Sequence, residues 1–195
     1  MTARCAGTAL DLGTGDGAFV LRRAGTDPDL FVVGVDANAA SMREASRRAA
    51  GPPRGGGLPN ALFVVAAAES LPAELRGFAD EVTVHFPWGS LLRGVVQAEP
   101  SIVDGLLRVT RPGGSISMLL SVTENDRESG VAPLDGAAVE ALAPRYAEHG
   151  LGLAEGRSAT SREIAEAHST WAKRLAAGPR REVWLLRFRR SRDRS

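Results

Sequence analysis

The chain has 195 residues, of which 44% are hydrophobic, and a net charge of +1, values typical of a single globular domain with a sizeable core. It contains no apolar run long enough to span a bilayer, and its first residues lack the charged and apolar regions of a signal peptide, so we expect a cytoplasmic protein without membrane contact. Its one cysteine excludes an internal disulfide, and together with three scattered histidines it offers no spacing for a metal site.

The basic residues are concentrated toward the C-terminus. Residues 1–156 hold 13 basic and 19 acidic side chains, whereas residues 157–195 hold 11 basic and 4 acidic ones. All basic residues except Lys173 are arginines, which make bidentate contacts with phosphate. Two interpretations stay open: a solvated basic tail over residues 187–195, or a surface that faces a polyanion.

Apolar runs alternate with helical patterns along the chain. This predicts one α/β domain over residues 1–195, a Rossmann-like fold with a seven-stranded, mostly parallel sheet and helices on both faces. The predicted strands are residues 8–12, 30–35, 61–66, 81–86, 114–120, 150–155 and 182–189. The predicted helices are residues 18–24, 38–49, 91–98, 101–109, 134–149 and 161–176. Asn38 fits the N-cap of the second helix, Gly150 fits the C-terminal end of the fifth, and residues 111–114 predict a turn.

The first predicted strand runs into a glycine turn, with Gly13, Gly15 and Gly17, and the turn opens a helix. Such a turn receives an adenosine-containing cofactor at the carboxyl end of a sheet. Asp16 inside the turn and Asp11 beside it would repel the pyrophosphate of a dinucleotide. S-adenosylmethionine, which has a cationic amino-acid end and no phosphate, suits these acids better. Because the glycine spacing also fits a dinucleotide fingerprint, a nicotinamide-binding oxidoreductase stays open as an alternative.

Two later positions extend this predicted cofactor site. Asp36, at the tip of the second strand, is placed to accept hydrogen bonds from two ribose hydroxyls, although such an acid can also simply begin a helix. Ala68 and Glu69 follow the third strand, where a small residue leaves room for an adenine ring and the carboxylate can accept from its amino group. The alternative for Glu69 is a solvated side chain.

The fourth predicted strand ends in His85-Phe86-Pro87-Trp88, at the switch point where a substrate meets the cofactor. Trp88 predicts a stacking platform for a flipped base, and the alternative is a core tryptophan beneath the next helix. Methylation of an exocyclic base amine usually needs Asn or Asp before the proline, and this chain has Phe86 there. The motif therefore favours attack by a ring nitrogen, whose free lone pair needs no base.

A second tryptophan, Trp171, lies in the long connection between the last two predicted strands. Ser169 is placed to bond to the cofactor or to the backbone, and Lys173 and Arg174 are placed to meet phosphate. The alternative is an amphipathic helix that buries Trp171 and Leu175, which are one helical turn apart.

These segments together resemble the aminoglycoside-resistance methyltransferases of the kanamycin–apramycin resistance type, which modify N1 of an adenine in the decoding site of 16S ribosomal RNA. The matching segments are residues 11–17, 56–60, 87–95 and 142–148, and Ser169-Thr170-Trp171 with the basic pair that follows. The glycine motif is common to all class I methyltransferases, whereas the segments around the two tryptophans are much narrower signals. Family members usually carry a short extension before the first strand, a β-hairpin on the RNA-facing side, and here that strand begins close to Met1.

The resemblance implies a monomeric class I methyltransferase that uses S-adenosylmethionine to modify 16S rRNA in the 30S subunit and so confers aminoglycoside resistance. The implied cofactor-binding residues are Asp11, Gly13, Thr14, Gly15, Asp36, Ala37, Ala68, Glu69, Phe86, Pro87, Ser90 and Ser169, of which Pro87, Ser90 and Ser169 would border the methionine end. Trp88 and Trp171 would hold the flipped adenine between their rings and position it for the reaction. The implied RNA contacts are Arg54, Lys173, Arg174 and Arg181.

Three alternatives to this function stay open at the level of the sequence. The first is methylation of transfer RNA or of a small molecule by the same fold. The second is hydride transfer with a nicotinamide cofactor. The third is a non-catalytic module that binds RNA with a strong dependence on salt.

Overall fold

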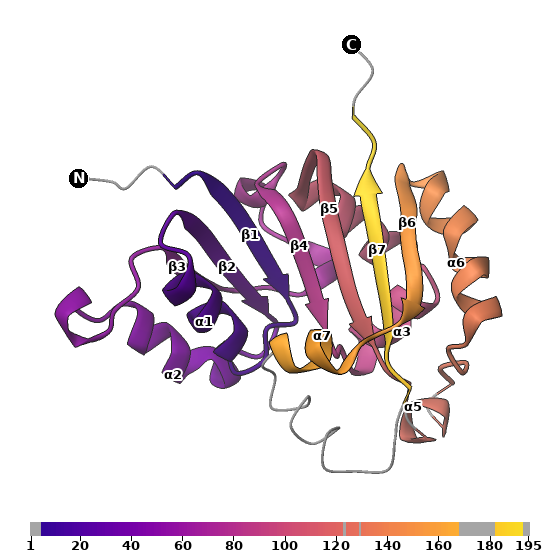
Figure 1. Ribbon diagram of the computed structural model, residues 1–195, viewed down its shortest axis with the longest axis horizontal. Helices are drawn as coiled ribbons and strands as arrows, with labels where there is room; N and C mark the ends of the chain where they lie inside the picture. The colour runs from indigo at the N-terminus through magenta and orange to yellow at the C-terminus, as the bar shows by residue number, and fades with distance from the viewer. Residues whose placement is uncertain (1–4, 123, 129, 168–181, 193–195) are drawn as a thin grey trace.

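The computed structural model describes residues 5–122, 124–128, 130–167 and 182–192, and it forms a layered α/β fold around one twisted sheet (Figure 1). The seven strands lie in the order β3-β2-β1-β4-β5-β7-β6. Their bounds are β1 Gly7–Leu12, β2 Leu30–Asp36, β3 Ala61–Val65, β4 Ala79–His85, β5 Thr110–Leu120, β6 Leu151–Ser158 and β7 Trp184–Arg190. The predicted fold class is thus confirmed, with strand boundaries that move by a few residues.

The direction of the strands sets where a ligand can bind. Strands β1 to β5 are parallel, and β7 runs antiparallel between β5 and β6. The strand order reverses at β1, which pairs with β2 on one side and with β4 on the other. At such a reversal the connections leave to opposite faces, so the carboxyl ends of β1 and β4 open a crevice.

Helices cover both faces of the sheet (Figure 1). On one face lie α1 Ala18–Thr26, α2 Ala39–Ala49 and α7 Ser161–Glu166; on the other lie α3 Gly89–Val96, α4 Pro100–Val109 and α6 Gly136–Glu148. The remaining short elements are α5 Glu124–Glu128 and the 3-10 turns η1 Pro53–Gly55, η2 Ala68–Ser70 and η3 Ala73–Leu75. Within the described ranges, no helix has the length and apolar character that a membrane span requires.

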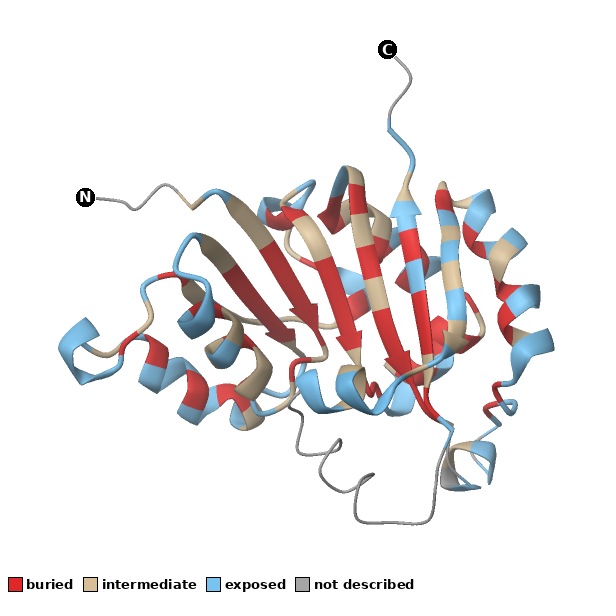
Figure 2. Cartoon of the chain, in the orientation of Figure 1, coloured by how far each residue is buried: buried red, intermediate tan, exposed pale blue. Residues whose placement is uncertain are grey.

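The core is largest between the sheet and the face of α3, α4 and α6. Tyr146 of α6 is fully buried there, its ring stacks on Phe188 at a centroid distance of 4.3 Å, and its hydroxyl donates to the carbonyl of Val95 at 2.8 Å. Burying a large apolar side chain stabilises the fold by about 1.5–3 kcal/mol. Figure 2 shows buried residues along the central strands and exposed ones on the outer sides of the helices. The strands whose carboxyl ends open the crevice are therefore held in place by a well-packed core.

Several local predictions are confirmed and others are corrected. The Asn38 side chain accepts from the amide of Ala40 at 3.0 Å, as predicted for an N-cap. The predicted turn at residues 111–114 is instead a bulge inside β5, because β4 pairs first with Thr110 and then with Ser115. Helix α7 ends at Glu166, and the rest of the predicted helix over residues 161–176 lies outside the described residues from position 168. The 3-10 turns and α5 are too short to show a helical period in the sequence.

Candidate active site

The glycine turn after β1 packs against the tip of β2. The amides of Gly13 and Thr14 donate to the carbonyl of Val35 at 2.8 and 3.0 Å. Gly17 has a φ of 73°, and a Cβ there would lie 2.6 Å from the Phe63 ring and 2.7 Å from Ala45. Only glycine permits both this conformation and this close approach, so the residue lets α1 start directly against β3 and α2.

Asp36, the last residue of β2, is held by two backbone amides. Its Oδ2 accepts from Gly15 and its Oδ1 from Asn38, each at 2.8 Å. A carboxylate offers about four lone-pair sites, so each oxygen keeps a site for a further donor. The carboxylate is thus fixed in orientation while still able to accept from a ligand.

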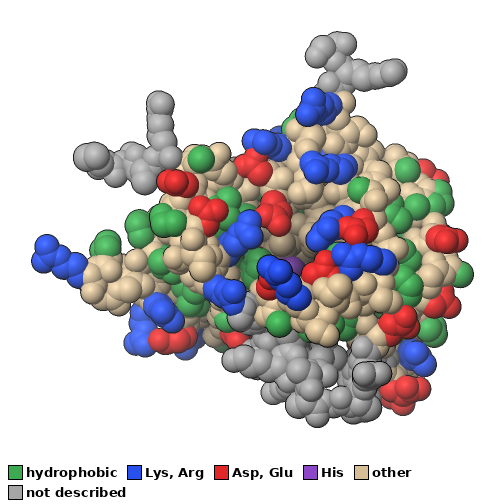
Figure 3. Space-filling model, in the orientation of Figure 1, with side chains coloured by type: hydrophobic (Ala, Val, Ile, Leu, Met, Phe, Trp, Pro, Cys, Tyr) green, Lys and Arg blue, Asp and Glu red, His purple; other side chains and the backbone are tan. Residues whose placement is uncertain are grey.

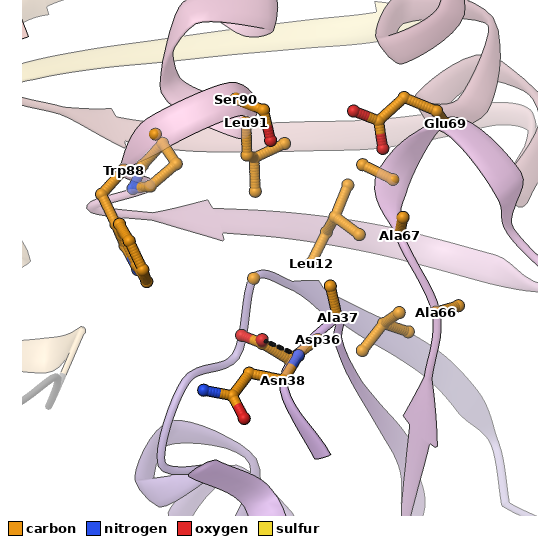
Figure 4. A pocket seen from close by; sticks show the side chains of 15 residues that line it. Leu12, Asp36, Ala37, Asn38, Ala66, Ala67, Glu69, Trp88, Ser90 and Leu91 are labelled. Atoms are coloured by element: carbon orange, nitrogen blue, oxygen red, sulfur yellow. Dashed lines mark hydrogen bonds between the residues drawn. The ribbon is translucent and has the colours of Figure 1, made fainter. Parts of the chain in front are cut away.

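A cavity of about 460 Å³ opens beside Asp36, between the carboxyl ends of β1 to β4 and the start of α3. In Figure 4, Asp36, Ala37 and Asn38 lie across the cavity from Ser90 and Leu91, with Trp88 and Glu69 at its two ends. The lining residues are Leu12, Gly13, Val35, Asp36, Ala37, Asn38, Ala66, Ala67, Ala68, Glu69, Pro87, Trp88, Gly89, Ser90 and Leu91. The run of three alanines makes one wall flat and apolar.

A second cavity, of about 200 Å³, adjoins the first and shares Gly13 and Trp88 with it. Its lining residues are Asp11, Gly13, Thr14, Gly15, Asp16, Phe19, His85, Phe86, Trp88 and Ala167. Two of these are carboxylates, and the described residues that line the two cavities include no lysine or arginine. The smaller cavity therefore favours a cationic group over a phosphate.

Asp11 is the most buried charged group of this site, with 3% of its surface exposed. Its Oδ1 accepts from the hydroxyl of Thr83, the residue opposite it on β4, at 2.7 Å. Burial raises the pKa of Asp11 to about 6, the Thr83 hydrogen bond opposes this rise, and the charges of Asp36 and Asp16 add to it. Asp16 itself accepts from the amide of Ala18 at 3.0 Å, at the start of α1.

His85 faces Asp11 from the end of β4. Its Nδ1 lies 3.9 Å from Oδ1 of Asp11, and its ring meets the ring of Phe19 edge-on at a centroid distance of 4.6 Å. Burial lowers the pKa of His85 to about 4, against a smaller opposing effect of the Glu81 charge. The imidazole is consequently neutral at neutral pH.

Trp88 precedes α3 and is 70% exposed, so the alternative of a core tryptophan beneath α3 is wrong. Its support is rigid, because the neighbouring Phe86 is buried against Leu119 and Ala167, and the Phe86 amide donates to the Leu119 carbonyl at 2.8 Å. An exposed indole on a fixed backbone offers a ring face for stacking.

The structure brings together most of the residues predicted to bind the cofactor. The larger cavity includes Gly13, Asp36, Ala37, Ala68, Glu69, Pro87 and Ser90, and the smaller one includes Asp11, Gly13, Thr14, Gly15 and Phe86. Pro87 and Ser90, expected at the methionine end, line the larger cavity rather than the smaller one. Ser169 and Trp171 lie outside the described residues.

Sequence reasoning missed the neutral residues that close the cavities. Asn38, Ala66 and Leu91 line the larger one, and Phe19, His85 and Ala167 line the smaller one. Positions at or just after the ends of β2 and β3 could have indicated Asn38 and Ala66, because parallel strands end at one edge. Phe19 and Ala167 carry no sequence signal of their own.

Arg54, a predicted RNA contact, is exposed in η1, on a loop that projects from the sheet beyond α2 (Figure 1). It lines neither cavity. The other predicted RNA contacts, Lys173, Arg174 and Arg181, lie outside the described residues.

Part of the basic C-terminal segment is structural. Arg187 of β7 pairs with Glu155 of β6 at 2.7 Å, and Arg190 donates to the carbonyls of Leu107 and Thr110 at 2.9 and 2.7 Å. A solvated tail over residues 187–195 is therefore wrong for residues 187–190, which form part of β7. Figure 3 shows basic and acidic side chains interspersed on the viewed face rather than one continuous basic patch.

Comparison with known proteins gives consistent matches. A family model described as NpmA, 16S rRNA (adenine(1408)-N(1))-methyltransferase, matches residues 1–189. A 16S rRNA (adenine(1408)-N(1))-methyltransferase of Streptoalloteichus tenebrarius is 42% identical over 173 residues, which are 85% of this chain and 79% of the relative.

Two solved structures are also similar. A mutant 16S rRNA (adenine(1408)-N(1))-methyltransferase from Catenulisporales acidiphilia, crystallised with cosubstrate SAM, superposes with a TM-score of 0.90 at 34% identity, covering 99% of this chain and 89% of that one. The aminoglycoside resistance methyltransferase NpmB1 superposes with a TM-score of 0.81 at 36% identity, covering 96% and 89%.

Proposed function

Because the chain belongs to the 16S rRNA (adenine(1408)-N(1))-methyltransferase family, we propose that its two cavities divide one S-adenosylmethionine molecule between them and that Trp88 holds the target adenine beside it. The protein is an S-adenosylmethionine-dependent methyltransferase that modifies N1 of an adenine in 16S rRNA, an activity of aminoglycoside-resistance enzymes. The observation that carries the residue assignment is the 70% exposed indole of Trp88 at the junction of both cavities.

The residues present fit this cofactor. The larger cavity offers Asp36 acceptor sites for two ribose hydroxyls, an alanine wall for a flat purine, and Glu69 for its amino group. The smaller cavity offers the carboxylates of Asp11 and Asp16 for a positively charged amino-acid end. The lack of lysine and arginine among the described lining residues speaks against the pyrophosphate of a dinucleotide.

Bound S-adenosylmethionine supplies an electrophilic methyl group on a sulfonium. Adenine N1 has a free lone pair at neutral pH, so this chain needs no general base for the transfer, and Phe86 stands where an amine-directed site would have Asn or Asp. The task of the protein is to fix the base in place, which can contribute up to roughly 7–11 kcal/mol to lowering a barrier. The base gains positive charge as N1 is methylated, and the π face of Trp88 stabilises a cation stacked on it.

We place the reaction in the cytoplasm, on the assembled 30S subunit, with one single-domain monomer per particle. Trp171 would complete the clamp on the base, and Ser169 would border the cofactor. Arg54, Lys173, Arg174 and Arg181 would contact phosphates, and each such contact adds to the salt dependence of binding.

The test is methyl transfer from tritiated S-adenosylmethionine to purified 30S subunits, free 16S rRNA and transfer RNA in parallel. We expect incorporation into 30S subunits and a primer-extension stop at one adenine of 16S rRNA. Faster incorporation into free 16S rRNA would overturn the assembled particle as the substrate. Incorporation only into transfer RNA would contradict the docking proposal as a whole.

A further inference from the structure

His85 is a polar side chain, 11% exposed, that the proposed function does not use. Building on the proposed assignment of the smaller cavity to the amino-acid end of S-adenosylmethionine, we infer that His85 is the positioning residue of that cavity, and that its imidazole keeps the Asp11 carboxylate oriented and ionised for the ammonium group of the cofactor.

The strand register places His85 beside Asp11. Thr83 on β4 is the cross-strand partner of Asp11. His85 follows Thr83 by two residues on the same strand, so the side chains of Thr83 and His85 point to the same face of the sheet. Thr83 already donates to Oδ1 of Asp11 at 2.7 Å, and Nδ1 of His85 lies 3.9 Å from that same oxygen. Two neighbours on one strand face therefore converge on one carboxylate.

The Nδ1 atom of His85 is buried and has no hydrogen-bond partner among the described residues. Buried polar atoms are nearly always bonded, so an unbonded one needs a partner that the ligand-free arrangement does not supply. Closing the gap to Asp11 to hydrogen-bond length needs a shift of about 1 Å. The imidazole is kept nearby by the edge-on Phe19 ring of α1, and Ala167 after α7 lines the same cavity.

The charges around the pair explain why such a donor matters. The negative charges of Asp36 on β2 and Asp16 in the glycine turn raise the pKa of Asp11. The negative charge of Glu81 on β4 raises the pKa of His85. From α1 and from the residue after α7, the cavity is lined by the uncharged Phe19 and Ala167. Burial raises the pKa of Asp11 to about 6 and lowers that of His85 to about 4. A hydrogen bond from a neutral imidazole favours the ionised form of Asp11 without adding a competing cation.

The effect of His85 is confined to one end of the cofactor. His85 lines the smaller cavity and not the larger one, where the nucleoside is proposed to bind. A ligand with the amino-acid end should therefore respond to replacement of His85, and a ligand without it should not. S-adenosylhomocysteine and 5′-methylthioadenosine form such a pair.

The experiment is calorimetric titration of both ligands into the wild-type protein, His85→Leu and His85→Asn at pH 7.5. We expect His85→Leu to weaken S-adenosylhomocysteine about tenfold, because a hydrogen bond to a charged group is lost, and to leave methylthioadenosine unchanged. His85→Asn should recover part of the loss, since its amide can donate to Asp11. His149→Leu is the matched control: His149 pairs with Asp104 at 2.7 Å, lines neither cavity, and should leave both affinities unchanged.

Equal weakening of both ligands by His85→Leu would show a purely structural role and overturn the inference, as would no change in either. A second readout compares the pH dependence of binding in the wild-type protein and in His85→Leu. In His85→Leu, the binding of S-adenosylhomocysteine should begin to weaken at a higher pH than in the wild-type protein as the pH falls toward 6, and methylthioadenosine should show no such difference; the same pH profile in both proteins would also overturn the inference. Methylation of 30S subunits tests the proposed function independently of all these outcomes.

Discussion

The larger and the smaller cavity share Gly13 and Trp88, yet they are built from different materials. The larger one has a wall of small neutral residues and two carboxylates, Glu69 at one end and Asp36, which two backbone amides hold in place. The smaller one gathers two carboxylates and a neutral imidazole, with Asp11 almost completely buried. Each cavity thus has two carboxylates, and the cavities differ in the rest of the lining and in burial. On the proposed assignment, the larger cavity selects its end of the ligand by shape and the smaller one by buried charge.

Trp88 lines both cavities, and its replacement should affect methyl transfer much more than cofactor binding. We expect Trp88→Ala to lower the rate of methyl transfer to 30S subunits about 100-fold, because the stacked base loses its orientation. The affinity for S-adenosylhomocysteine, measured by calorimetry, should stay within about threefold. Leu62→Ala, at another exposed apolar side chain on the edge strand β3, is the control and should change neither quantity. A large loss of cofactor affinity in Trp88→Ala would mean that the indole mainly shapes the cavity.

Asp36→Ala tests the cavity that selects by shape. We expect S-adenosylhomocysteine to bind roughly 30-fold more weakly, since the ribose loses a charged acceptor and two backbone amides lose theirs. Methylthioadenosine should weaken by a similar factor, because the ribose is common to both ligands. Asp29→Ala, an exposed acid just before β2, is the matched control. If only the ligand with an amino-acid end weakened, Asp36 would belong to the other cavity.

Asp11→Asn tests the smaller cavity. We expect it to weaken ligand binding and to stabilise the folded protein. The folded-state pKa of Asp11 is about 6, above its ordinary value of 3.8, so its contribution favours folding at low pH and is lost as the pH rises through 6. At pH 8 the substitution should therefore raise the free energy of unfolding by up to about 3 kcal/mol, while S-adenosylhomocysteine binds about tenfold more weakly.

Thermal or urea unfolding of the ligand-free protein at pH 8 and pH 4 measures the stability change, and calorimetry measures the binding. The gain should shrink at pH 4, where Asp11 is protonated in the folded protein. A destabilised Asp11→Asn protein at pH 8 would show that the ionised carboxylate, and not its protonated form, supports the fold.

Glu163→Gln should have the smallest effect, because Glu163 lies in α7 and does not itself line the smaller cavity. Glu163 caps α7 through Thr160 and pairs with Arg157 at 2.7 Å, and Ala167 of the cavity follows this helix. We expect a loss of about 1 kcal/mol in the free energy of unfolding, measured by urea denaturation at pH 7, and a smaller loss at high salt. The hydrogen bond from Arg157 holds the pKa of Glu163 at about 2, below 4.5, so this contribution should persist above pH 4.5 and vanish as the pH falls through 2. A salt-independent loss would point to the cap rather than to the ion pair.

The sequence was a good guide wherever the chemistry is local. The strands are apolar runs, and the glycine turn, Asp36 and Trp88 follow directly after strands, where parallel topology places ligands. The residues that close the smaller cavity were not predictable in this way. Phe19 and Ala167 are far apart in the chain and line one cavity because α1 and α7 lie on the same face of the sheet.

The basic C-terminal segment shows the same limit. Its composition favours a free tail or a polyanion surface, but the pairing of β7 with β5 and β6 was needed to show that Arg187 meets Glu155. Charge counted along a sequence does not say which charges neutralise one another in space.

One consequence follows from the antiparallel insertion of β7 between β5 and β6. Ser158, the last residue of β6, pairs with Trp184, the first residue of β7, so the connection between them leaves and re-enters the sheet at the edge that carries both cavities. Any sequence grafted between these two anchors is delivered to the mouth of the site. Because Ala167 lies within this connection and lines the smaller cavity, exchanging the connection would also change the cavity proposed to hold the amino-acid end of the methyl donor.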